Sequence, residues 1–238
     1  DIQELNYFSD STFINDETKV LLATNEESIF RRSSLGNYYV YDVKDESLSA
    51  IAEDKIQEPT FSPDGSKVAY GLNNNLYVKD FNSNETTQIT FDGEKNKIIN
   101  GITDWVYEEE FKFVRAFDWN AAGNKIAFIR FDETEVPEFS MDIYGTGLYQ
   151  TQQVFKYPKA GEANSLASLH IYDLDSNSTT QVKVEKAYND FYIPRIKWTN
   201  NADVLSAHYM NRHQNELDLW MINAQTNTSN LVLSEIDK

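Results

Sequence analysis

The chain has 238 residues, contains no cysteine and carries a formal net charge of −17 at pH 7. This negative charge repels a phosphate backbone and argues against nucleic acid as a partner, while the lack of cysteine excludes disulfides, thiol catalysis and cysteine-bound zinc. Hydrophobic residues make up 40% and aromatic residues 13%, mostly Tyr and Phe, which predicts a sizeable core built from sheets, and no apolar run is long enough to cross a bilayer.

Four similar units follow one another along the chain, each with an aromatic residue, a polar turn and a strand of alternating apolar residues. They are FINDETKVLLA from Phe13, FSPDGSKVAYG from Phe61, WNAAGNKIAFI from Trp119 and WTNNADVLSAH from Trp198. A second strand follows in each unit: YYVYDV from Tyr38, LYVKDF from Leu76, LHIYDL from Leu169 and LWMINA from Leu219. Each unit therefore predicts a small antiparallel sheet whose side chains alternate with a period of two.

A sheet of this kind cannot bury both of its faces alone, so successive units must stack on one another. Stacked β-units of about 40–50 residues are typical of β-propeller blades. Most propellers need about four to eight blades to close a ring, so we predict an all-β partial β-propeller of about four blades. A β-sandwich or a β-solenoid is the alternative. The spacing between units widens along the chain and marks two insertions, at 92–117 and 131–168.

The first insertion contains DWVYEEEF, in which three consecutive glutamates lie between aromatic residues. The segment is compatible with a short helix that has Thr103 or Asp104 as its N-cap. Neighbouring helical positions are about 100° apart, so three carboxylates cannot share one face, but two can converge on an ammonium group, which has three donors. The residues alone leave two interpretations open: a site for a cationic ligand, or acidic side chains on a solvated helix.

Four longer segments carry a more specific pattern than the repeats do. They are FSPDGSKVAYGLNNNLYVKD from Phe61, NGITDWVYEEEF from Asn100, FDETEVPEFSMDIY from Phe131 and YPKAG from Tyr157. In combination and order they resemble the dipeptidyl peptidase IV family, and the similarity runs through nearly the whole chain. The resemblance implies an eight-bladed N-terminal propeller joined to an α/β-hydrolase domain, in a serine exopeptidase that releases dipeptides with Pro or Ala at the second position from peptide N-termini.

The same resemblance assigns residues to a substrate-binding site. The family's two amine-binding glutamates correspond to Glu109 and Glu110, and Glu108 is left without a ligand role. The family's propeller arginine, which contacts the substrate carbonyl and the glutamates, corresponds to Arg31, or to Arg32 if the register slips by one residue. The implied ligand is a peptide with a free N-terminus, and neither a cofactor nor a metal is implied.

The segment that begins at Phe131 and ends at Lys159 resembles the extended arm that helps the family dimerise. The resemblance therefore implies a homodimer for the full-length protein. It also implies a location outside the cytoplasm, whether periplasmic, secreted or membrane-anchored.

The sequence does not contain the G-x-S-x-G pentapeptide of an α/β-hydrolase nucleophile. His170, His208 and His213 have no serine–acid constellation around them and are predicted to be packing or surface residues. We therefore expect residues 1–238 to be a fragment of the N-terminal propeller domain, inactive alone, with the catalytic domain C-terminal to it. A non-enzymatic propeller scaffold is the main alternative, and a sialidase-like enzyme is a second.

Overall fold

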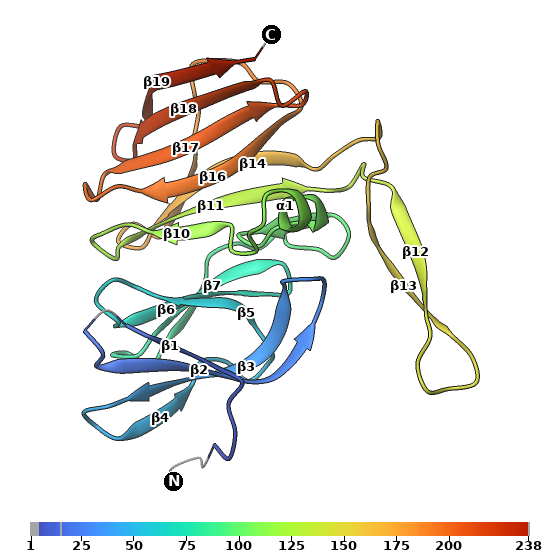
Figure 1. Ribbon diagram of the computed structural model, residues 1–238. Helices are drawn as coiled ribbons and strands as arrows, with labels where there is room; N and C mark the ends of the chain where they lie inside the picture. The colour runs from blue at the N-terminus through green and yellow to red at the C-terminus, as the bar shows by residue number, and fades with distance from the viewer. Residues whose placement is uncertain (1–4, 15, 238) are drawn as a thin grey trace.

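The computed structural model describes residues 5–14 and 16–237, which form five antiparallel sheets. Four of these sheets, here called blades 1 to 4, are stacked face to face (Figure 1). Blade 1 contains β1 (Asp10–Phe13), β2 (Lys19–Ser28), β3 (Ser34–Asp42) and β4 (Ser47–Ala50), and blade 2 contains β5 (Gln57–Phe61), β6 (Lys67–Leu72), β7 (Asn75–Asp80) and β8 (Thr86–Gln88). Blade 3 contains β10 (Phe117–Trp119), β11 (Lys125–Asp132), β14 (Leu166–Asp173) and β15 (Ser178–Gln181), and blade 4 contains β16 (Phe191–Trp198), β17 (Val204–Asn211), β18 (Glu216–Asn223) and β19 (Thr228–Ile236). The predicted partial propeller of about four blades is confirmed.

Both insertions lie on blade 3. The first contains β9 (Ile98–Asn100), which pairs with the far half of β11, and the helix α1 (Trp105–Glu110). The second forms a hairpin of β12 (Glu138–Ile143) and β13 (Thr151–Lys156), here called the arm hairpin, which projects away from the stack (Figure 1). In the part of the chain that the structure describes, no helix is long and apolar enough to cross a membrane.

The third strand of every blade ends in the same turn chemistry. A side-chain oxygen of its last residue accepts backbone N–H groups of the following turn, as Asp80 does from Asn82 and Ser83 at 2.8 and 3.1 Å. The four residues that act in this way are Asp42, Asp80, Asp173 and Asn223. Each of these turns also has one residue at a positive φ of 49–58°, namely Glu46, Asn84, Asn177 and Asn227. Because these contacts are local, the repeated units are recognisable from the sequence.

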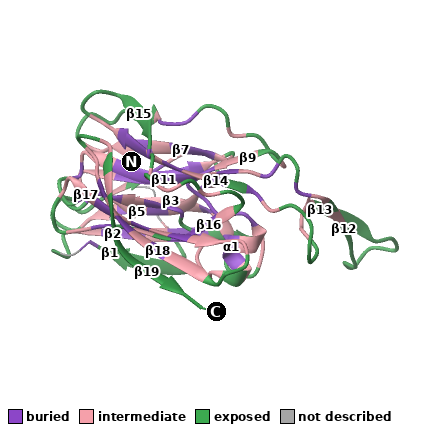
Figure 2. Cartoon of the chain, turned by 90° about the horizontal axis from the view of Figure 1, so that it is seen from above, coloured by how far each residue is buried: buried purple, intermediate pink, exposed green. Residues whose placement is uncertain are grey.

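Apolar side chains fill the spaces between consecutive blades, and β11 shows how one strand serves two of them. Ile126 and Phe128 pack toward blade 2, whereas Ala127 and Ile129, which alternate with them, pack toward blade 4, as the period of two requires. Two tryptophans link neighbouring blades: Trp119 Nε1 donates to the carbonyl of Thr60 at 3.1 Å, and Trp198 Nε1 donates to that of Asp118 at 3.0 Å. Buried residues therefore concentrate in the stack, whereas the outer strands and the arm hairpin are exposed (Figure 2).

Candidate functional site

Helix α1 is held rigidly although it is only six residues long. Asp104 is its N-cap, and its Oδ1 accepts the backbone N–H of Tyr107 at 2.9 Å, while its Oδ2 accepts from the Ser165 hydroxyl. Burial raises the pKa of Asp104. The buried Tyr107 hydroxyl accepts the backbone N–H of Ile193 at 2.9 Å, which connects the helix to blade 4. The glutamates that follow therefore project from a helix whose position is fixed.

The three glutamates of the helix lie in three different environments, as their angular spacing requires. Glu108 is 1% exposed, and its Oε1 accepts the backbone N–H groups of Arg32 at 2.6 Å and Ser33 at 3.0 Å. Glu109 is partly exposed, and Glu110 is exposed at the end of the helix. Sequence reasoning assigned no ligand role to Glu108, and in the structure its carboxylate binds the protein's own backbone.

Arg31 and Glu109 form an ion pair although 78 positions separate them in the sequence. Arg31 Nε lies 3.1 Å from both carboxylate oxygens of Glu109. Arg32 Nη1 is farther from that carboxylate, at 3.8 Å, and donates to the backbone carbonyl of Glu108 at 3.3 Å. Both arginines belong to residues 29–33, the loop that joins β2 to β3 at one end of blade 1 (Figure 1). The structure therefore brings Arg31, more than Arg32, to the carboxylate of Glu109.

A cleft of about 740 Å³ opens beside this ion pair. Arg31, Glu109 and Lys159 line it, whereas Glu110 is not among its lining residues and makes no side-chain hydrogen bond within the described residues. The remaining wall is largely aromatic: Phe30, Trp105, Phe139, Phe155 and Tyr157. The cleft thus combines one carboxylate–guanidinium pair with an apolar surface, a combination that suits a small cationic group attached to an apolar one.

The aromatic wall also attaches the arm hairpin to the site. Phe155 of the hairpin packs against Phe30 with ring centroids 5.5 Å apart, and Tyr157 packs edge-on against Trp105 at 4.4 Å. Phe30 precedes Arg31, and Trp105 opens the helix that carries Glu109. Sequence reasoning missed these residues because the partners come from three separate segments, and no local pattern links them.

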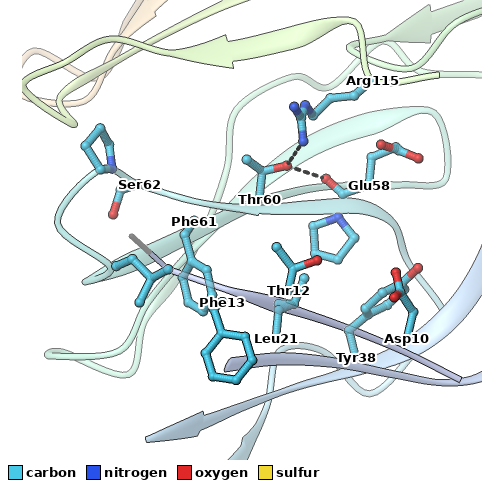
Figure 3. Close-up of a pocket in the computed structure, with 13 residues that line it drawn as sticks. Asp10, Thr12, Phe13, Leu21, Tyr38, Glu58, Thr60, Phe61, Ser62 and Arg115 are labelled. Carbon is cyan, nitrogen blue, oxygen red and sulfur yellow. Dashed lines mark hydrogen bonds between the residues drawn. The ribbon is translucent and has the colours of Figure 1, made fainter. Parts of the chain in front are cut away.

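A second cavity, of about 350 Å³, lies between blades 1 and 2 (Figure 3). Arg115 Nη1 donates to the Thr60 hydroxyl at 2.8 Å, and this hydroxyl donates to the backbone carbonyl of Glu58 at 3.1 Å. Burial raises the pKa of Glu58, and the nearby charge of Glu108 raises it further. Neither Arg31 nor any of the three helix glutamates lines this cavity, so it is distinct from the cleft.

The histidines lie apart from the cleft. The His170 ring stacks on Phe128 with centroids 5.3 Å apart, and its Nε2 is 2.9 Å from the Ser168 hydroxyl. Burial lowers the pKa of His170 to about 4. His213 is exposed, and His208 is half-buried. Within residues 5–14 and 16–237, no three His, Asp or Glu side chains gather closely enough to hold a metal ion.

The stacked blades define the class of this protein as a partial β-propeller, and Glu109 of the inserted helix, paired with Arg31 of the blade 1 loop, marks a candidate ligand cleft. The family described as the dipeptidyl peptidase IV (DPP IV) N-terminal region matches residues 15–238. The chain belongs to this family.

Individual relatives agree with that membership. Dipeptidyl aminopeptidase B of Saccharomyces cerevisiae is 30% identical over 92% of this chain, and dipeptidyl-aminopeptidase B of Aspergillus niger is 31% identical over 91%. These matches cover 27% and 26% of the relatives, so the chain spans about a quarter of their length. The crystal structure of Porphyromonas gingivalis dipeptidyl peptidase 4 superposes with a TM-score of 0.94 at 38% identity, covering 100% of this chain and 34% of that one.

Proposed function

We propose that this chain is the substrate-anchoring propeller portion of a DPP IV-like serine exopeptidase, which releases X-Pro or X-Ala dipeptides from peptide N-termini. Glu109 and Glu110 bind the free ammonium group of the peptide, and Arg31 binds the adjacent carbonyl. The observation that carries the proposal is the Arg31–Glu109 ion pair at the cleft, in which the Arg31 side chain is 71% exposed and that of Glu109 is 18% exposed.

The chemistry of the pair supports binding of an ammonium group. A carboxylate offers about four lone-pair sites, and Arg31 occupies the Glu109 carboxylate through its Nε–H. An ammonium group brings three donors and a full positive charge, and each charge-assisted hydrogen bond contributes about 1.5–3 kcal/mol. An acetylated N-terminus has lost this charge. The site therefore favours a free N-terminus over a blocked one.

Arg31 can bind a carbonyl while it remains beside Glu109. A guanidinium has five N–H donors, and within the described residues only the Nε–H of Arg31 hydrogen-bonds to Glu109. The other donors suit the carbonyl oxygen that lies next to a peptide's ammonium group. Glu110 is the last residue of the helix and is exposed, so its side chain can turn toward the same ammonium group.

Anchoring these two groups determines which peptide bond is cleaved. Once the ammonium and the first carbonyl are fixed, the bond after the second residue occupies a defined place relative to blade 3, and a nucleophile held there cleaves off a dipeptide. The N-cap at Asp104 and the hydrogen bond between Tyr107 and Ile193 hold the helix that serves as the reference point. Uniform release of dipeptides follows from this rigidity.

We further propose that the full-length protein is a homodimer joined through the arm hairpin. Apolar side chains at the tip of the hairpin are highly exposed: Tyr144 at 79%, Leu148 at 97% and Tyr149 at 86%. Exposed apolar groups gathered in one place are typical of surfaces that bind another protein. A second copy of the chain, as the family resemblance implies, is the partner.

The test measures hydrolysis of Gly-Pro-p-nitroanilide by the full-length protein. Glu109→Gln and Glu110→Gln should each lower kcat/KM by about 10- to 100-fold, because each replaces a charged acceptor of the ammonium group. Glu85→Gln removes an exposed carboxylate in a turn of blade 2 and serves as the matched control. Kinetics like those of the wild type in both site variants would overturn the proposal.

A further inference from the structure

We infer that Glu108 is a positioning residue of the substrate-anchoring site, because its buried carboxylate holds the loop that carries Arg31. The inference rests on the proposed function and deepens it. It gives a role to the one glutamate of the three that neither the helix pattern nor the family resemblance explains.

The contacts of Glu108 connect the helix to this loop at three points. Its Oε1 accepts from two consecutive backbone N–H groups, those of Arg32 at 2.6 Å and Ser33 at 3.0 Å. Its own backbone carbonyl accepts from Arg32 Nη1 at 3.3 Å. With 1% of Glu108 exposed, water cannot replace these partners, so the helix and the loop depend on each other.

The loop is tight, and Ser33 closes it. The backbone N–H of Ile29 donates to the Ser33 carbonyl at 2.8 Å, and that of Phe30 donates to the Ser33 hydroxyl at 3.2 Å. Arg31 lies inside this turn, directly before Arg32 and Ser33, whose backbone N–H groups Glu108 accepts. Its own side chain is 71% exposed, so the backbone beneath it, more than side-chain packing, determines where the guanidinium sits. Glu108 therefore sets the distance from Arg31 to Glu109.

Glu108 binds the loop through one of its two carboxylate oxygens. Oε2 of Glu108 is buried and has no hydrogen-bond partner among the described residues, so Oε1 alone makes the contacts to Arg32 and Ser33. A buried acceptor without a partner costs stability, and the contacts to the loop offset that cost.

A double-mutant cycle separates positioning from general stabilisation. The full-length protein is titrated calorimetrically with the product dipeptide Ala-Pro, which has a free ammonium group and is not cleaved further. Glu108→Ala and Arg31→Ala should each weaken binding by about tenfold, and the double variant should bind within about twofold of Arg31→Ala. If the two losses multiply instead, Glu108 does not act through Arg31, and the inference is wrong.

Two further variants keep the test decisive if Glu108→Ala does not fold. Glu108→Asp retains the charge but is too short to reach both N–H groups, and it enters the same cycle with the same expectation. Asp218→Asn alters a fully buried carboxylate on blade 4 and should lower stability without changing the affinity for Ala-Pro. A loss of affinity in Asp218→Asn equal to that in Glu108→Asp would also overturn the inference.

The same titration distinguishes failure of the inference from failure of the proposed function. If Glu109→Gln binds Ala-Pro as tightly as the wild type, and N-acetyl-Ala-Pro binds equally well, the ammonium site itself is wrong. If Glu109→Gln loses affinity while the Glu108 and Arg31 effects multiply, the ammonium site stands and only the positioning role of Glu108 fails.

Discussion

Two clusters of ion pairs in this chain differ in how many of their hydrogen-bonding groups the protein itself uses. At the cleft, Arg31 meets Glu109 with most of the arginine exposed. Against blade 4, Lys186 Nζ contacts both Glu216 and Asp218, the latter at 2.6 Å. The Asp218 side chain is 0% exposed.

In the second cluster, one carboxylate oxygen of Asp218 has two partners from the protein itself. Oδ2 of Asp218 accepts from Lys186 and from the Tyr188 hydroxyl, and this hydroxyl in turn accepts from Trp220 Nε1 at 2.8 Å. Among the residues that the structure describes, none saturates Arg31 in this way at the cleft. The difference shows that an ion pair in this fold is structural when buried neighbours use its donors and acceptors. An ion pair is available to a ligand when its donors and acceptors remain in contact with water in a cleft.

Asp218→Ala should have the largest effect on the free energy of unfolding. Asp218 is buried although its partner Lys186 is 35% exposed, so removing the carboxylate takes an acceptor from Lys186 and from the buried side of the cluster, and we expect a loss of about 2–3 kcal/mol. Urea denaturation followed by circular dichroism measures it, with Glu85→Ala as the exposed control. A loss below about 1 kcal/mol would show that this cluster is no more structural than the cleft pair.

Glu133 is intermediate between these two clusters in its electrostatics. It is buried, and the charge of Lys156 offsets only part of the cost of burying its carboxylate. Burial raises its pKa to about 7 from 4.5, against the opposing charge of Lys156. Between these two values the folded state binds more protons than the unfolded state, so this contribution to stability is present below pH 4.5 and is lost as the pH rises through about 7.

Glu133→Gln should remove that dependence and make the protein more stable than the wild type at pH 8 by about 1–2 kcal/mol. The half-buried His170 gives the opposite slope, because its pKa is about 4 and stability falls as the pH drops below 6.5. The difference between wild type and Glu133→Gln at each pH isolates Glu133. A difference that does not change between pH 5 and 8 would contradict the assignment.

Arg31→Ala should have the smallest effect on stability and a clear effect on function. An ion pair with an exposed arginine contributes about 0–1 kcal/mol, so the urea midpoint should stay close to that of the wild type. The kcat/KM for Gly-Pro-p-nitroanilide in the full-length protein should still fall about tenfold, because the carbonyl contact is lost. A large loss of stability in this variant would show that the Arg31–Glu109 pair is structural, as the Asp218 cluster is, and would contradict the distinction between them.

The blades were predictable because their signals are local. An alternating strand, a polar turn and a terminal residue such as Asp80 or Asn223 lie within a few positions of each other, and the side chain of that terminal residue closes the turn that follows it. The helix start was predictable for the same reason, since Asp104 caps the N–H of Tyr107 three positions on.

The candidate site was predictable only through the family resemblance. Periodicity shows that three consecutive glutamates must diverge, but it cannot say which of them is buried. Burial of Glu108 depends on Arg32 and Ser33, which lie in another blade. Likewise, nothing in FDETEVPEFSMDIY indicates that the hairpin it begins will place Phe155 against Phe30.

The sequence by itself determined the repeated sheets, their turns and the position of the charged helix, because these depend on contacts between near neighbours in the chain. The tertiary structure decided which glutamate is buried, which arginine meets Glu109 and which aromatic residues line the cleft. These outcomes depend on the stacking of blades 1 and 3 with the arm hairpin, which brings together groups as far apart as Arg31 and Glu109.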